Sequence, residues 1–370
     1  MGITRLANVT GLDVIGIPVY MCIRPNSRNL SVSQGKGLDP SSAKASALME
    51  SIESWHAESL DLPLRHESQS VLRRTTRTLD LDDLTRRPDV PMYGPMLWLA
   101  GYDLLAGEPF WVPHELVNLT YVPQAGRIPL FPRSSNGLAS GNHILEATSH
   151  ALCEVIERDA MALWSLGDDA HAKATQLDLA TVDDPGCRAL LDRIDHAGVG
   201  VAAWDITSDL GIPAYTCTIY DRPGSMRVAG LFCGIGCHLS ATVALDRAIT
   251  EAAQSRLTAI SGSRDDILPS KFGEARNEDD LKNFHEAIGL PQPELSFGAR
   301  GSLAGATFEH DVSLLLDALR HVGIAGAAIV DLTKPDLGIP VVKVIVPGLE
   351  QWGVEGHRPG ARARARLGGK

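Results

Sequence analysis

The chain has 370 residues, of which 44% are hydrophobic and 21% are charged, a composition typical of globular proteins. Its formal net charge of -11 argues against a nucleic-acid-binding protein, whose surface would normally be basic. The sequence has neither an apolar run of the roughly 18 residues that a transmembrane helix needs nor an N-terminal signal peptide. Its cysteines lack the paired spacing of a zinc site. We therefore expect a cytoplasmic protein with reduced thiols that binds neither nucleic acid nor a membrane.

Three strand-like segments of similar sequence occur along the chain. They are GIPVYMCI at residues 16–23, GIPAYTCT at 211–218 and GIPVVKVI at 338–345, each a few residues after an aspartate. A strand tolerates proline at its first residue, and the β-branched residues that follow favour the extended backbone. We predict a strand in each segment.

Three further segments share a helical pattern, Ala-x-x-x-Ala-[Leu/Ile]-x-Glu-x-x-[Glu/Gln], without gaps. They cover residues 43–53, 147–157 and 244–254, and each follows a glycine-rich stretch. The spacing puts two small residues and the first acid on one stripe of a helix. Small residues let neighbouring backbones approach closely, so we expect acids of different helices to come within reach of one another. We interpret the segments as repeats of one unit.

The rest of the chain also alternates between strand-like and helical patterns. Residues 57–132 carry short strand-like runs, and residues 170–206 and 306–346 each have the pattern of a helix, a turn and a strand. We predict an α/β or α+β fold, organised as one domain over residues 1–370 because no low-complexity linker divides it. For the Gly-, Pro- and Arg-rich residues 353–370 we expect a loosely ordered tail, with Arg362, Arg364 and Arg366 solvated.

Acidic residues on the first two predicted helices are the candidate metal ligands. They are Glu50, Glu53, Glu154 and Glu157. Acids three apart share a helix face and repel one another when buried, so they need a cation. Mg²⁺ prefers oxygen ligands and usually shares its coordination with substrate phosphates, which suggests a nucleotide. Lys36 and Arg158 would neutralise phosphate charge. The sequence has neither Gly-x-x-x-x-Gly-Lys-[Ser/Thr] nor Gly-x-Gly-x-x-Gly, so such a nucleotide site would have no phosphate loop.

Three ordered motifs resemble the nucleotide-binding segments of the YcaO family. The motifs are SVSQGKGLDPSSAKASALMESIES, SSNGLASGNHILEATSHALCEVIERDA and RAITEAAQSRLTAISGSRDD. The resemblance covers most of the chain and implies an unusual α/β fold that binds ATP and Mg²⁺ without a phosphate loop. Members of this family use ATP to phosphorylate the oxygen of a backbone amide after a nucleophile has added to its carbonyl carbon.

The resemblance also implies roles for individual residues. It places Mg²⁺ at Glu50, Glu53, Glu154 and Glu157. It implies contacts with the nucleotide for Ser33, Lys36, Ser46, Asn142, Glu146 and Arg158. It implies catalytic roles for Arg158, Gln254 and Arg264. The sequence departs from the family at Ser54, where many members have arginine, and at its end, RPGARARARLGGK, where azoline-forming cyclodehydratases commonly have a Pro-x-Pro-x-Pro tail.

We therefore expect an ATP- and Mg²⁺-dependent enzyme that modifies a backbone amide in a ribosomally synthesised peptide or protein. The missing proline tail favours thioamide formation, and an azoline-forming cyclodehydratase acting on Cys, Ser or Thr is the alternative. The resemblance implies a separate partner protein, either TfuA-like or a leader-binding or E1-like protein, and leaves a homodimer open. A second hypothesis is a non-catalytic module that binds ATP or peptide, which Ser54 favours and the complete set of acids opposes.

Overall fold

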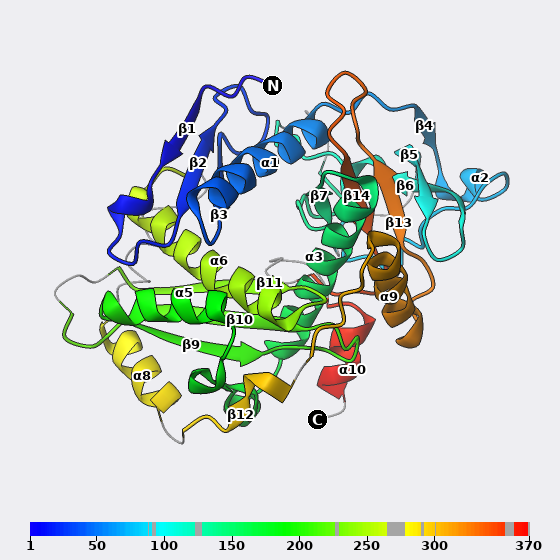
Figure 1. Ribbon diagram of the computed structural model, residues 1–370. Coiled ribbons are helices and arrows are strands. Elements are labelled where there is room, and N and C mark those ends of the chain that lie inside the picture. The colour runs from blue at the N-terminus through cyan, green and yellow to red at the C-terminus, as the bar shows by residue number, and fades with distance from the viewer. Residues whose placement is uncertain are drawn as a thin grey trace. The chain divides into compact units, whose positions relative to one another are not determined.

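The computed structural model describes residues 1–87, 89–90, 94–122, 128–225, 229–264, 278–289, 292–299, 301–351 and 359–368 (Figure 1). The chain divides into two compact units. Unit 1 comprises Met1–Ile52, Gly167–Thr207 and Pro213–Ala304, and unit 2 comprises Glu53–Leu166, Ser208–Ile212 and Gly305–Lys370. The expectation of one domain over residues 1–370 stays a prediction.

Unit 1 contains two antiparallel three-stranded sheets. The first has the order β1-β2-β3, with β1 at Arg5–Asn8, β2 at Val19–Ile23 and β3 at Val32–Lys36. The second has the order β11-β10-β9, with β9 at Val199–Asp205, β10 at Ala214–Asp221 and β11 at Leu231–Cys237. The short strands β8 (Leu177–Asp178) and β12 (Leu295–Ser296) form a parallel pair.

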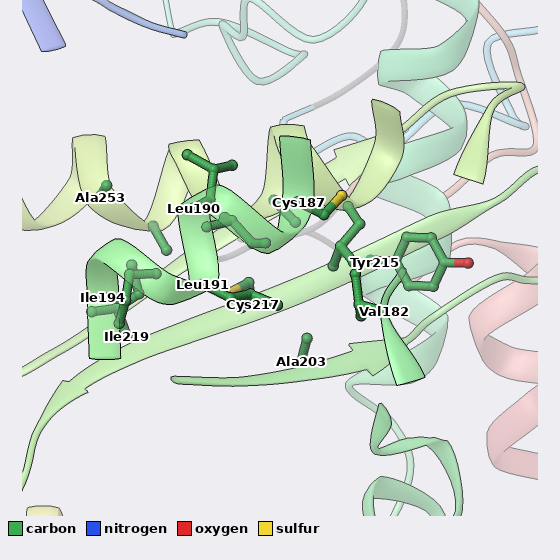
Figure 2. Close-up of a cluster of buried hydrophobic side chains, with 14 of the residues drawn as sticks. Val182, Cys187, Leu190, Leu191, Ile194, Ala203, Tyr215, Cys217, Ile219 and Ala253 are labelled. Atoms are coloured by element: carbon green, nitrogen blue, oxygen red, sulfur yellow. The ribbon is translucent and has the colours of Figure 1, made fainter. Parts of the chain in front are cut away.

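The helices of unit 1 are α4 (Asp169–Thr175), α5 (Pro185–His196), α6 (Ala241–Ser261), α8 (Glu278–Gly289) and the first part of α1 (Pro40–Glu58), which ends in unit 2. Two of them, α5 and α6, enclose the main core of the unit against the second sheet. Helix α6 packs along β11 and β10. Figure 2 shows Leu191 and Ile194 of α5 in the same buried cluster as Cys217 and Ile219 of β10. Helix α5 begins where the sequence signals it, because Asp184 accepts hydrogen bonds from the first amides after Pro185.

Unit 2 is built on a six-stranded antiparallel sheet. Its order is β4-β5-β13-β14-β7, and β6 also pairs with β5. The strands are β4 (Leu64–Glu67), β5 (Met96–Asp103), β6 (Glu108–Pro113), β7 (Leu138–Ser140), β13 (Ala328–Asp331) and β14 (Val341–Ile345). Its helices are α2 (Gln69–Leu72), α3 (Ile144–Trp164), α9 (Phe308–His321) and α10 (Ala361–Gly368). Helix α3 packs against β14, β7 and α9.

The structure confirms the strands and helices that the sequence patterns predict. The three Gly-Ile-Pro segments lead into β2, β10 and β14, and each strand begins directly after the proline rather than at it. The glycines that open the turns, Gly16, Gly211 and Gly338, have φ of 73°, 72° and 62°, a conformation that favours glycine. The three Ala- and Glu-containing segments lie in α1, α3 and α6.

The alanines of two of these helices face glycines of a strand. A Cβ atom built on Gly35 of β3 would lie 2.4 Å from the carbonyl oxygen of Ala43 and 1.9 Å from the amide nitrogen of Ala47 on α1. A Cβ atom on Gly236 of β11 would lie 2.1 Å from the Ala244 oxygen and 2.7 Å from the Ala248 nitrogen on α6. The small residues of α1 and α6 therefore allow a helix to approach a strand, whereas the sequence pattern suggested an approach between helices.

The structure also describes the state of the cysteines and the apolar character of the helices. All six cysteines are free, and five of them are buried. Among the helices in the described part of the chain, none is long and apolar enough to cross a membrane.

The expectation of a loosely ordered tail over residues 353–370 is wrong for residues 361–368, which form α10. Residues 352–358 and 369–370 lie outside the described residues. Arg362 of α10 is not solvated as expected, because its guanidinium pairs with the fully buried Asp159 of α3 through bonds of 3.0 and 3.1 Å. The carboxylate of the buried Glu350 accepts amide hydrogen bonds from Gly360 and Ala363 at the start of α10, each 2.8 Å long. These long-range contacts order a segment that composition alone assigns to the solvent.

We expect Arg362→Met to lower the free energy of unfolding by about 3 kcal/mol, because it leaves the buried Asp159 carboxylate without its cation. The matched control is Arg364→Met on the exposed side of the same helix, which should stay within about 0.5 kcal/mol of the wild type. Urea unfolding followed by circular dichroism measures both. Equal losses in the two variants would contradict the buried ion pair.

Candidate functional site

In unit 1, strand β3 and helix α1 bring together three of the predicted site residues. The carboxylate of Glu50 accepts a hydrogen bond of 3.2 Å from the backbone amide of Gln34. The backbone amide of Lys36 donates to the hydroxyl oxygen of Ser46 at 3.3 Å. Ser46 and Glu50 are four residues apart and so lie on one face of α1. This face is therefore held against the strand by side-chain contacts to its backbone.

The two faces of β3 meet different helices. Side chains alternate along a strand, so Ser33 lies on the same face as Gly35, whose Cβ position is occupied by α1. The Lys36 side chain lies on the other face, where its ammonium group pairs with the carboxylate of Glu251 on α6 at 2.5 Å. Ser33 and Lys36, both predicted to contact the nucleotide, therefore extend to opposite sides of one strand.

Glu251 is a site candidate that the sequence reasoning did not select. It fills the first acid position of the shared helical pattern in α6, and that pattern was the signal that could have singled it out. Gln254 lies less than one turn further along the same helix, and Arg264 follows shortly after the helix ends.

The carboxyl group of Glu50 is surrounded by charges of both signs. Desolvation by the surrounding protein raises the pKa of Glu50, and the negative charge of Glu251 adds to this rise. The positive charges of Lys36 and Arg264 oppose it. By its accessible surface Glu50 is exposed. Water therefore reaches this carboxylate and limits its desolvation. The carboxylate therefore ionises less readily than a free glutamate, and a cation beside it would favour its charged form.

In unit 2, the segment around β7 contacts two of the predicted metal ligands. The hydroxyl group of Ser140 donates to the carboxylate of Glu53, on the last part of α1, at 2.5 Å. The backbone amide of Gly137 donates to the carboxylate of Glu154, on α3, at 3.2 Å. The predicted acids of two helices are thus each bonded to the same short segment of chain.

Arg158 pairs with acids of its own helix. Its guanidinium lies 3.5 Å from the carboxylate of Glu157 and 4.0 Å from that of Glu154. Glu157 is 2% exposed, so its charge depends on a nearby cation. The structure therefore groups Glu154, Glu157 and Arg158, as the sequence predicted.

Asn142 and Glu146 form a local pair at the start of α3. The backbone amide of Asn142 donates to the Glu146 carboxylate at 2.7 Å, and its side-chain amide donates to the same oxygen at 3.1 Å. Glu146 lies in the first turn of the helix, where a negative charge is favourable. These contacts give both residues a role in forming the start of the helix. Their predicted contact with a nucleotide stays a prediction.

Lys343 is a second residue that the sequence reasoning missed. It lies in the middle of β14 and is 3% exposed. Burial lowers the pKa of its ammonium group to about 8, and the negative charge of Glu154 opposes this shift. The signal in the sequence was a single charged residue within the apolar run VVKVIV.

In each unit taken by itself, the candidate donors fit Mg²⁺ bound together with phosphate groups. Every candidate ligand is a carboxylate, the oxygen donor that Mg²⁺ prefers. The positive charge of Lys36 acts on Glu50, and the guanidinium of Arg158 lies beside Glu157, as anionic phosphates require.

Comparison with known proteins identifies a matching family and several similar structures. The sequence model of the family described as YcaO cyclodehydratase, ATP- and Mg²⁺-binding, matches residues 34–350. A protein encoded in the tfuA 3' region of Rhizobium leguminosarum bv. trifolii is 39% identical over 360 residues, which cover 94% of this chain and 84% of that protein. A protein of Methanothermobacter thermautotrophicus is 35% identical over 370 residues, which cover 99% and 94% of the two chains.

Two solved structures share the fold. A heterocyclase in complex with substrate and cofactor has a TM-score of 0.77 at 22% identity, covering 95% of this chain. The chain spans 50% of the length of that heterocyclase. YcaO from Methanopyrus kandleri, bound with AMPPCP and Mg²⁺, has a TM-score of 0.74 at 23% identity and covers 95% and 87% of the two chains.

We expect Mg²⁺ to stabilise the wild-type protein and to lose this effect in Glu157→Gln, because the variant removes a buried carboxylate that is predicted to be a ligand. At a Mg²⁺ concentration about tenfold above the dissociation constant, the gain should be about 1.4 kcal/mol. Unfolding with and without Mg²⁺ measures it. Glu67→Gln, on β4 of the same unit, is the control and should keep the full gain. A gain in Glu157→Gln equal to that of the wild type would exclude Glu157 as a ligand.

Proposed function

The chain belongs to the YcaO family of ATP- and Mg²⁺-dependent enzymes that modify the peptide backbone, and on that premise we propose that it converts a backbone amide of a peptide or protein into a thioamide. The observation that carries this choice of product is the relative named for its place beside tfuA. Thioamide-forming systems of the family use a partner of the TfuA type. We therefore also propose that a TfuA-like protein is the partner of this chain.

We assign the predicted site residues to this reaction. The proposed Mg²⁺ ligands are Glu50, Glu53, Glu154 and Glu157. The proposed nucleotide contacts are Ser33, Lys36, Ser46, Asn142, Glu146 and Arg158. Arg158, Gln254 and Arg264 are the proposed catalytic residues. Support comes from the hydrogen bonds that fix Glu50, Glu53 and Glu154 to neighbouring backbone or hydroxyl groups, since ligands held in place lose little freedom on binding.

The chemistry of the proposed reaction explains why cations matter more than a nucleophilic side chain. A sulfide adds to the amide carbonyl carbon, and the resulting oxyanion attacks the γ-phosphate of ATP and displaces ADP. The carbon–oxygen bond then breaks, phosphate leaves, and loss of the proton from sulfur completes the thioamide. Mg²⁺, when bound, neutralises charge on the phosphates. The guanidinium of Arg158 would stabilise the charge that develops on the transferred group.

We further propose that the three Ala- and Glu-containing helices, each with its preceding strand, are repeats of one structural unit. Support comes from equivalent contacts: Gly35 meets the first and second alanines of the repeated pattern in α1, and Gly236 meets those of the pattern in α6. Gly141, before α3, likewise lies against the first alanine of its helix, where an added Cβ would come within 2.8 Å of the Ala147 nitrogen.

We expect Glu50→Gln and Glu154→Gln each to abolish ATP-dependent turnover while leaving the fold intact, because each removes a charge that holds Mg²⁺. Phosphate release with ATP, Mg²⁺, peptide and partner protein measures turnover, and circular dichroism verifies folding. Glu286→Gln, on the exposed side of α8, is the control and should retain wild-type turnover. Full activity in both glutamine variants would contradict the metal assignment, and absence of phosphate release by the wild type would favour a non-catalytic module.

The product separates the two chemistries of the family. We expect mass spectrometry of the peptide to show one oxygen replaced by sulfur when a sulfide donor is supplied. Loss of one water without gain of sulfur would instead identify an azoline, and would contradict the proposed thioamide.

A further inference from the structure

Lys343 is held in place by the backbone of a segment far from it in the sequence. Its ammonium group donates hydrogen bonds of 2.7 Å to the carbonyl oxygens of Ser134 and Asn136. These residues precede β7, and all three lie in unit 2. Because Lys343 is 3% exposed, water cannot readily replace these contacts. The side chain therefore joins the middle of β14 to the loop before β7.

The same loop holds the carboxylate of Glu154. The next residue after Asn136, Gly137, donates its amide to Glu154 at 3.2 Å and accepts a hydrogen bond of 2.7 Å from the amide of Val344. Gly137 has a φ of 76°, and a Cβ atom there would lie 2.2 Å from the carbonyl oxygen of Val344. The loop is therefore pressed against β14, and Lys343 and Val344 fix it from adjacent positions.

Lys343 also acts on Glu154 through charge. Glu154 is the carboxylate whose negative charge acts on the Lys343 ammonium group. Glu154 thus has two positive charges near it, Lys343 on β14 and Arg158 on its own helix. A single buried lysine therefore holds the loop whose next amide meets this acid and also places a positive charge near it.

We propose that Lys343 is a positioning residue for Glu154, and that it keeps this carboxylate and the Ser134–Asn136 loop in the arrangement that binds a divalent cation. The inference rests on the proposed role of Glu154 as a Mg²⁺ ligand. Groups that orient a metal ligand typically change metal affinity by 10- to 100-fold when they are removed.

Positioning and simple repulsion predict opposite changes in metal affinity. If Lys343 were only a positive charge near the site, its removal would strengthen the binding of a cation. If it positions Glu154 and the loop, its removal would weaken that binding, because the carboxylate would lose its orientation.

The test is a titration of the full chain with Mn²⁺, an oxygen-preferring stand-in for Mg²⁺, followed by the loss of the free-ion signal in electron paramagnetic resonance. We expect Lys343→Met to bind Mn²⁺ about 10- to 100-fold more weakly than the wild type. A purely structural defect would instead lower the number of sites per chain without changing the affinity of those that remain. The control is Lys334→Met, which removes a lysine of the same unit whose ammonium group donates to the backbone oxygen of Ser59, and it should bind as the wild type does.

Equal or tighter Mn²⁺ binding by folded Lys343→Met would overturn the inference and leave the proposed function standing. Absence of binding by the wild type would contradict both the metal ligands of the proposed function and the role of Lys343. If Lys343→Met does not unfold cooperatively, the same titration is done with Lys343→Gln. The amide of this glutamine can still donate to a loop carbonyl, although the charge is lost. Weaker binding by this variant supports the inference, and equal or tighter binding overturns it.

Discussion

Charge balance around carboxylates determines how the candidate site is built. An acid held close to protein atoms needs a positive charge nearby, since the surrounding protein replaces part of its hydration. In unit 1 the cation beside Glu251 is Lys36, and in unit 2 Arg158 lies beside Glu157. The same requirement explains why α10 is ordered, because its Arg362 pairs with the fully buried carboxylate of Asp159. Ion pairs of this kind therefore order both the candidate site and the last helix.

Close approach between strands and helices decides where these charges lie. Glycines on β3 and β11 leave no room for a side chain, so the alanines of α1 and α6 lie directly against the strand backbone. At this distance a glutamate of the helix can accept a hydrogen bond from a strand amide, as Glu50 does from Gln34. A bulkier residue at Gly35 would separate the two elements and break that contact.

Membership of the YcaO family agrees with a candidate site in which acids pair with lysine and arginine side chains. In the proposed reaction the attacking groups come from the substrates, and the protein orients them and neutralises charge. In this proposal Lys343 has a supporting role, because it is neither a metal ligand nor a nucleophile. It holds the Ser134–Asn136 loop, and the amide of the next residue, Gly137, donates to Glu154. The precision of a metal site often depends on such supporting groups.

Local patterns in the sequence were enough to predict the strands after each Gly-Ile-Pro turn, the acid-bearing helices and the grouping of Glu154 with Glu157 and Arg158. These features depend on residues within one or two turns of one another, so spacing alone reveals them. The pairing of Lys36 with Glu251, the contact of Lys343 with the loop before β7, and the docking of α10 join residues far apart in the sequence. Only the tertiary structure decided these, because composition and periodicity describe which face a side chain occupies but not which distant segment packs against it.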